Sequence, residues 1–173
     1  LPEICAAVTS GDLQAIESLE PLVDLFEVRI DLIGKGWRDV AARLKKPWIA
    51  CNRRAEEGGK WKGSERSRIK ELTGALELGA RIIDIELETP EIEEVVKEFK
   101  GRSEVLISYH DLKETPPLDR MRQIVINQLA AGADICKVVT TARSFKDNLV
   151  VLQLIAAFPE TKIVSFAMGA AGQ

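Results

Sequence analysis

The chain has 173 residues, of which 46% are hydrophobic, and a formal net charge of -3. This length suits one compact core and is short for two ordinary domains, so we expect a single domain over residues 1–173. The net negative charge gives no sign of a basic surface that would bind nucleic acid. No apolar run reaches the roughly 18 residues of a membrane span, and the N-terminal segment lacks the regions of a signal peptide. We therefore expect a cytoplasmic protein that binds neither nucleic acid nor membrane.

The three cysteines give no sign of a metal site, because none of them forms a Cys-x-x-Cys pair. Cys51 and Cys136 lie in apolar, strand-like runs, which is typical of buried free thiols. We expect all three to be structural.

Short apolar runs alternate with segments of helical periodicity along the whole chain. Strands are predicted at 3–8, 25–30, 47–52, 81–87, 104–109, 134–139 and 162–167. Helices are predicted after Ser10, from Ser64, from Thr89 with Pro90 at its first position, over 116–132, and after Ser144, where Asp147 completes a sequence similar to a capping box. This alternation predicts a parallel sheet, because parallel strands need crossover connections.

Two parallel architectures compete, an open doubly wound sheet and a closed (β/α)8 barrel. The Gly-rich fingerprint of a doubly wound dinucleotide-binding sheet is absent after the first strand, where the sequence is AAVTSGDLQ. Central strands of an open sheet should also be almost continuously apolar. Here Glu27, Arg29 and Asp31 alternate with apolar residues, and so do Asp84 and Glu86.

Such alternation in a lone strand usually indicates an antiparallel strand with one wet face. Helices should cover the outer faces here, so the pattern favours a TIM barrel whose polar strand face lines the lumen, with active-site residues at the carboxyl ends of the strands. The sequence stops at GAAGQ after the seventh strand, whereas such a barrel has eight. We expect that the last βα unit is missing from this chain or that the closure is unusual.

The polar residues at these strand ends predict imine chemistry. Lys137 lies between Cys136 and Val138 in an apolar strand, where burial of an unpaired ammonium is costly and should lower the lysine pKa. A neutral amine there can attack a carbonyl and form an imine, which acts as an electron sink. The alternative is that Lys137 forms an ion pair with Asp84 or Glu86.

His110 is the only histidine, and it follows the strand before that of Lys137. An imidazole can accept and return a proton near neutral pH, so His110 is the predicted general acid and base. Glu57 is the predicted carboxylate that fixes its tautomer. The alternative is a structural histidine paired with Asp111. Glu27, Arg29 and Arg53 offer groups for a substrate rich in hydroxyls or carrying a carboxylate.

The motifs EVRID, NRRAEEGG, SYHD, ADICKVV and SFAMGAAG, in this order and spacing, resemble type I 3-dehydroquinate dehydratase over nearly the whole chain. The resemblance implies a (β/α)8 hydro-lyase of the shikimate pathway of aromatic amino acid biosynthesis, without metal or cofactor, in which Lys137 forms a Schiff base with 3-dehydroquinate. His110 would remove the α-proton and then protonate the departing hydroxyl. The substrate-binding positions fall on Glu27, Arg29, Arg53 and Met168, and the partner of the histidine falls on Glu57. The family also suggests a homodimer.

The sequence departs from the family after GAAGQ. The family's next serine and arginine, and its loop after the eighth strand, would lie beyond Gln173, so a chain ending there should have an open barrel and severely reduced activity. Two alternatives remain at this stage. One is another imine-forming barrel of the class I aldolase type, with MGAAG as a phosphate loop. The other is a catalytically impaired, truncated barrel that serves as a binding protein or scaffold.

Overall fold

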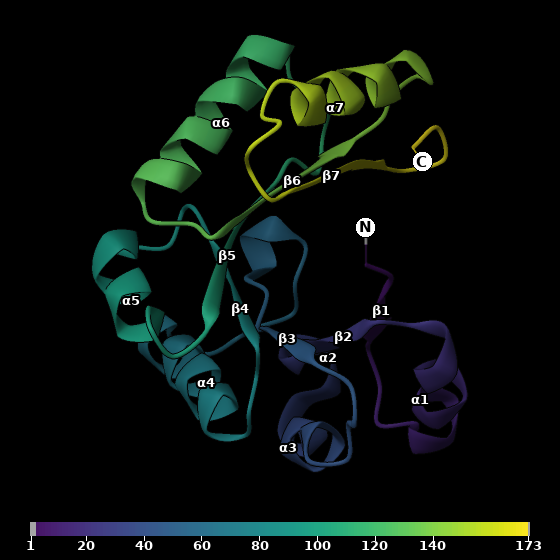
Figure 1. Ribbon diagram of the computed structural model, residues 1–173, viewed down its shortest axis with the longest axis vertical. Coiled ribbons are helices and arrows are strands. Elements are labelled where there is room, and N and C mark those ends of the chain that lie inside the picture. The colour runs from purple at the N-terminus through teal and green to yellow at the C-terminus, as the bar shows by residue number, and fades with distance from the viewer. Residues whose placement is uncertain (1–2, 173) are drawn as a thin grey trace. The chain divides into compact units, whose positions relative to one another are not determined.

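The computed structural model describes residues 3–172, in which strands and helices alternate (Figure 1). The strands are β1 (Cys5–Val8), β2 (Leu25–Arg29), β3 (Trp48–Cys51), β4 (Ile82–Glu86), β5 (Glu104–His110), β6 (Ile135–Thr141) and β7 (Ile163–Met168). The helices are α1 (Leu13–Leu19), α2 (Ile30–Ile33), α3 (Trp37–Ala41), α4 (Glu65–Glu77), α5 (Ile92–Phe99), α6 (Leu118–Ala130) and α7 (Lys146–Ala156). Each predicted strand is therefore confirmed to within a few residues.

The strand order follows the sequence from β1 to β7, and the neighbouring strands whose registers are defined run parallel. Sequential parallel strands with intervening helices are the pattern of a (β/α)8 barrel and not of a doubly wound sheet, whose strand order reverses. The predicted fold class is confirmed.

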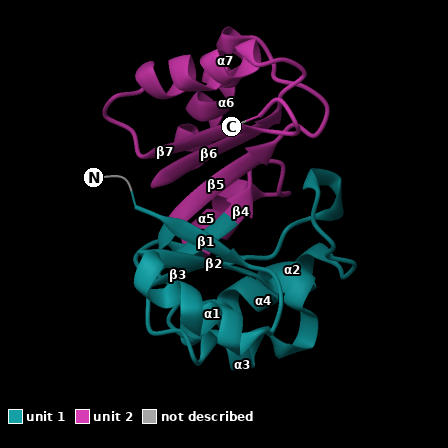
Figure 2. Ribbon diagram, turned by 90° about the vertical axis from the view of Figure 1, so that its right-hand side faces the viewer, with its two compact units in different colours: residues 1–84, 99–104 teal, residues 85–98, 105–173 magenta. Residues whose placement is uncertain are grey.

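The chain forms two compact units (Figure 2). Unit 1 contains residues 1–84 and 99–104, and unit 2 contains residues 85–98 and 105–173. Strand β4 contributes to both, since its first residues pair with β3 in unit 1. In unit 2, the N–H of Leu87, directly after β4, donates to the Ser108 carbonyl on β5 at 2.8 Å.

In unit 1, alternate residues of β2 have opposite environments. Phe26 and Val28 have no exposed surface, whereas Glu27 and Arg29 are only partly buried. Helix α3 contacts β2, and helix α4 contacts β3. The indole of Trp37 on α3 lies with its centroid 6.4 Å from that of Trp48 on β3. The period-two pattern of the sequence therefore separates an apolar core from a polar strand face.

In unit 2, helices α6 and α7 share one core with β6. Their buried residues include Met121, Val125 and Leu154, which cluster with Cys136 and Val138 of the strand. Since side chains alternate along a strand, Lys137 and Val139 belong to the opposite face of β6.

Two helix starts differ from the predictions. Helix α1 is capped by Asp12 rather than Ser10, and the Asp12 carboxylate accepts the N–H of Ala15 at 3.1 Å. Helix α5 begins at Ile92, because Glu91 has a φ of 55°, in the left-handed region outside a right-handed helix. Thr89 and Pro90 therefore lie in the turn before the helix.

Two other starts match more closely. Ser64 caps α4 by accepting the N–H of Ser67, as predicted. At α7 the N-cap is Phe145, one residue after the predicted Ser144. The carboxylate of Asp147 accepts the N–H of Ser144 at 2.9 Å and that of Arg143 at 2.7 Å. These two main-chain hydrogen bonds hold the pKa of Asp147 below its usual value. Helices α2 and α3 were not predicted, because Gly34 and Gly36 interrupt their apolar pattern.

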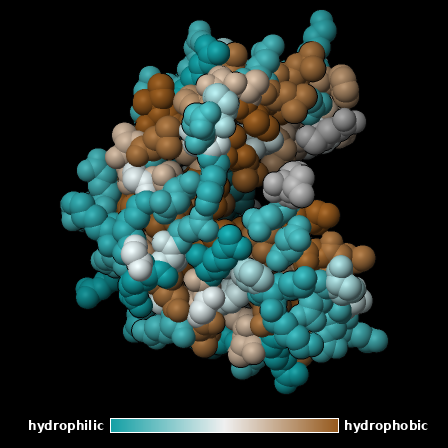
Figure 3. Space-filling model, in the orientation of Figure 1, coloured by the Kyte–Doolittle hydropathy of each residue, from teal (hydrophilic) through white to brown (hydrophobic). Residues whose placement is uncertain are grey.

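Unit 2 carries several exposed apolar side chains, and Figure 3 shows apolar surface over the region of α7. They lie on α7, just before it, and on β7: Phe145, Leu149, Leu152, Val164 and Phe166. On β7, Val164 and Phe166 are about 40% exposed although they belong to a strand. In the described part of the chain, β7 pairs only with β6.

No helix among the described residues is long and apolar enough to cross a membrane.

The buried thiols should resist alkylation in the native protein. Cys5 is exposed, whereas Cys51 and Cys136 are buried as predicted, and burial raises the pKa of Cys136 to about 11. At pH 8 such a thiol is only ~0.1% thiolate, against roughly 25% for an ordinary exposed one. Mass spectrometry after brief iodoacetamide treatment should find Cys5 labelled and Cys136 unmodified. Equal labelling in native protein would contradict this burial.

Candidate active site

In unit 2, the register of β5 and β6 brings two of the predicted residues onto one face. Ser108 pairs with Lys137, and His110 pairs with Val139. Residues directly opposite each other in a sheet point to the same side, so His110 and Lys137 share a face on neighbouring strands. Their Cα atoms are offset by one strand and two residues, which amounts to about 8 Å. Both side chains therefore start from neighbouring positions on the same face of the sheet.

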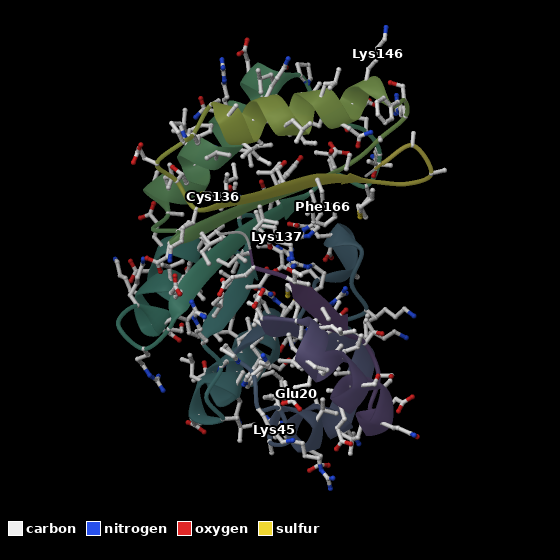
Figure 4. The ribbon with its side chains drawn as sticks, turned by 45° about the vertical axis from the view of Figure 1, so that its right-hand side comes forward. Glu20, Lys45, Cys136, Lys137, Lys146 and Phe166 are labelled. Carbon is white, nitrogen blue, oxygen red and sulfur yellow. The ribbon has the colours of Figure 1, made fainter. Side chains whose placement is uncertain are left out.

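Lys137 has only 7% of its surface exposed, on the face of β6 opposite to Cys136 (Figure 4). On its other side, β7 places Val164 directly opposite Lys137 and Phe166 opposite Val139. Val164 and Phe166 thus form an apolar flank beside Lys137 on this face of the sheet.

Met168 also belongs to this face, because it pairs with Thr141, which follows Lys137 by four residues. It is partly buried at the carboxyl end of β7. Thus unit 2 carries three of the predicted residues on one face: His110 and Met168 at the carboxyl ends of β5 and β7, and Lys137 within β6.

Helix α6 holds the main chain of Lys137 through a side-chain hydrogen bond. The fully buried amide of Gln128 donates to the carbonyl oxygen of Lys137 at 2.9 Å. Directly after His110, the carboxylate of Asp111 accepts the N–H groups of Lys113 and Glu114, each at 2.9 Å. The Asp111 carboxylate thus accepts hydrogen bonds within its own turn. This arrangement gives no support to the predicted alternative, in which Asp111 is the partner of the histidine.

In unit 1, the predicted pair Glu27 and Arg29 lies on one face of β2, in register with Ile49 and Cys51 of β3. The Arg29 guanidinium forms a bidentate pair with Asp31, at 3.0 Å from Nε and 2.9 Å from Nη2. Burial opposes the charge of Arg29, but the hydrogen bond with Asp31 and nearby negative charge prevail and raise its pKa.

Arg53 and Glu57 follow β3 and are almost entirely buried, with 3% and 9% of their surfaces exposed. The Nη2 atom of Arg53 lies 2.6 Å from a carboxylate oxygen of Asp84 on β4. Glu57 ends a short 3-10 turn over Ala55–Glu57. Unit 1 therefore holds the four predicted residues Glu27, Arg29, Arg53 and Glu57 on β2 and on the segment after β3.

The family model for type I 3-dehydroquinase matches residues 4–173. The chain belongs to the type I 3-dehydroquinase family. It is 42% identical over 173 residues to a 3-dehydroquinate dehydratase of Dehalococcoides mccartyi, covering 99% of this chain and 77% of that protein.

Solved members of the 3-dehydroquinases share the fold. The type I 3-dehydroquinate dehydratase of Clostridium difficile matches with a TM-score of 0.85 at 24% identity, over 99% of this chain and 77% of that one. The Geobacillus kaustophilus 3-dehydroquinate dehydratase matches with a TM-score of 0.82 at 26% identity, over 99% and 76% of the two chains. Membership of this family decides against the aldolase alternative.

Sequence reasoning did not foresee the role of two carboxylates, Asp31 and Asp84, that engage the predicted arginines. The sequence indicated Asp31 only as a charge alternating with apolar residues, and Asp84 as such a charge and as a possible partner of Lys137. The available signal was the presence of acidic residues beside arginines on one face, since a buried guanidinium needs a carboxylate partner. Asp31 follows the predicted strand 25–30 and lies in the first turn of α2.

Removal of Asp84 should destabilise the protein strongly. Its side chain has no exposed surface and that of Arg53 has 4%, so Asp84→Ala leaves a buried guanidinium without this carboxylate. We expect the free energy of unfolding in urea to fall by about 3–5 kcal/mol. The control is Asp119→Ala, whose partner Arg122 lies 3.4 Å away in an exposed pair and should contribute less than about 1 kcal/mol. Equal losses in both variants would contradict the importance of the buried pair.

Proposed function

We propose that this chain catalyses the reaction for which its family is named, the dehydration of 3-dehydroquinate to 3-dehydroshikimate, through an imine on Lys137. The observation that carries the proposal is the buried lysine on β6 with His110 on the same face of β5. A buried amine is a nucleophile for a ketone, and an adjacent imidazole can move the proton that the imine makes acidic.

The steps balance without a metal or cofactor. The Nζ atom of Lys137 attacks the ketone carbon, and loss of one water gives the imine. His110 removes a proton from the adjacent carbon, and the electron pair moves into the imine to form an enamine. The enamine expels the hydroxyl one carbon further along, which His110 protonates as it leaves as water. Hydrolysis of the resulting imine consumes one water and frees Lys137, so the net change is the loss of one water.

The remaining predicted residues take the supporting roles. Glu27, Arg29 and Arg53 bind the hydroxyl and carboxylate groups of the substrate, for which arginine offers a planar, bidentate set of donors. Glu57 orients the imidazole of His110 and stabilises its protonated form. Met168 lines the pocket. The burial of Arg53 and Glu57 supports these roles, because charged groups in a dry site act more strongly on a substrate.

An eighth βα unit would complete this enzyme. The Dehalococcoides relative is longer, since the match covers 77% of its length. In this chain, β7 and α7 expose apolar residues that a further strand and helix would cover, among them Phe166 and Leu152. We propose that such a unit completes a single barrel domain, and that a chain lacking it would show the impaired activity of the truncated alternative.

Two further expectations remain proposals, a homodimer and a cytoplasmic location. Light scattering of the purified protein would test the first, and a mass equal to one chain would contradict it.

Borohydride trapping tests the imine directly. Incubation with 3-dehydroquinate and sodium borohydride should reduce the imine to a stable secondary amine, and peptide mapping should find it on Lys137. Lys137→Met should form no adduct, whereas the control Lys146→Met changes an exposed lysine of α7 and should form it normally. An adduct on another lysine, with Lys137 unmodified, would overturn the proposed mechanism.

Replacement of the histidine separates imine formation from proton transfer. His110→Ala should still give the borohydride adduct, because the amine of Lys137 is retained. Its kcat should fall by about 10²- to 10⁴-fold, which is the usual contribution of general acid-base catalysis. Spectrophotometry of the conjugated product measures this rate, and an unchanged kcat would show that another group moves the proton.

A further inference from the structure

The carboxylate of Asp31 joins two segments of unit 1 that carry proposed substrate-binding residues. Its oxygen Oδ1 accepts Nε of Arg29 at 3.0 Å, and Oδ2 accepts Nη2 of Arg29 at 2.9 Å. The same Oδ2 also accepts the main-chain N–H of Lys60 at 2.9 Å. The Asp31 side chain has no exposed surface. Three donors on a buried carboxylate form a much firmer arrangement than a surface ion pair.

The local backbone makes this geometry possible. Strand β2 ends at Arg29 and helix α2 begins at Ile30, so Asp31 lies in a helical turn. Continuation of the strand would separate Arg29 and Asp31 by almost 7 Å along the sheet, whereas the turn brings the carboxylate back to the guanidinium. The pair uses the Nε and Nη2 edge of Arg29, so its Nη1 side is directed away from Asp31.

The second segment is the loop after β3. Lys60 reaches Asp31 because two glycines precede it: Gly58 has a φ of 81°, and a Cβ at Gly59 would lie 2.0 Å from the carbonyl oxygen of Arg53. The N–H of Gly59 donates to the carbonyl of Arg54 at 2.8 Å and closes the loop. This loop contains Arg53 and Glu57, so Asp31 links it to Arg29.

We propose that Asp31 is a positioning residue for the dehydration. Its carboxylate sets the direction of the Arg29 guanidinium and holds the loop of Arg53 and Glu57 next to Arg29. The inference rests on the proposed role of Arg29 in substrate binding. Since Asp31 acts through Arg29 and the loop, its loss should weaken binding of the substrate more than it slows the chemical steps on Lys137. A side chain held in one orientation loses less entropy when it binds a ligand.

The test compares Asp31→Ala, Asp31→Asn and Arg29→Ala with the unaltered protein. We expect KM for 3-dehydroquinate to rise at least tenfold in Asp31→Ala and in Arg29→Ala, with kcat reduced less than KM is raised. Asp31→Asn keeps one acceptor oxygen and the side-chain volume, so its KM should lie between those of Asp31→Ala and the unaltered protein. The control Asp39→Asn removes an exposed carboxylate of α3 and should leave both constants unchanged.

Chemical rescue distinguishes positioning from general stability. Formate fits the space of the missing carboxylate, so it should lower KM in Asp31→Ala and leave KM of the unaltered protein the same or slightly raised. A well-folded Asp31→Ala or Asp31→Asn with normal KM, beside an Arg29→Ala with raised KM, would overturn the role of Asp31. Normal KM in both Asp31→Ala and Arg29→Ala would instead overturn the proposed role of Arg29, and the inference with it.

Discussion

Coverage of one face of β6 by α6 and α7 is the constraint on which the chemistry of unit 2 depends. The helices form a core with Cys136 and Val138, so the residue between them must point to the opposite face. The parallel register then places Ser108 and His110 of β5 and Val164 of β7 around it. Lys137 is thereby held on the face that it shares with His110, which is the arrangement that the proposed imine chemistry needs.

Unit 1 holds its charged groups by a different means. Arg29 and Arg53 each have a carboxylate partner from their own unit, Asp31 at 2.9 Å and Asp84 at 2.6 Å. These pairs fix the guanidinium groups before a substrate arrives, and preorganised charges stabilise a reacting ligand without having to rearrange around it. Each unit, taken by itself, thus carries a different kind of candidate group: unit 2 an amine with an imidazole on the same face, and unit 1 prealigned guanidinium donors.

The strands could be predicted from the sequence because both of their signals are local, namely short apolar runs and charges at every second position. The candidate lysine and histidine followed from the same pattern, since a lysine between apolar strand residues is chemically unusual wherever the strand lies. Details that depend on backbone conformation could not be predicted. The left-handed Glu91 displaces the start of α5 past Thr89. The partnership of Asp31 with Lys60 depends on a loop whose path no periodicity describes.

The most direct test of the central claim is a crystal structure of His110→Ala soaked with 3-dehydroquinate. Without its proton carrier, the protein should accumulate the imine, so the account predicts continuous electron density between Nζ of Lys137 and the former ketone carbon. It also predicts the substrate on the face of β6 opposite to Cys136. A substrate bound without a covalent bond, or joined to a different lysine, would contradict the claim that this buried amine is the nucleophile.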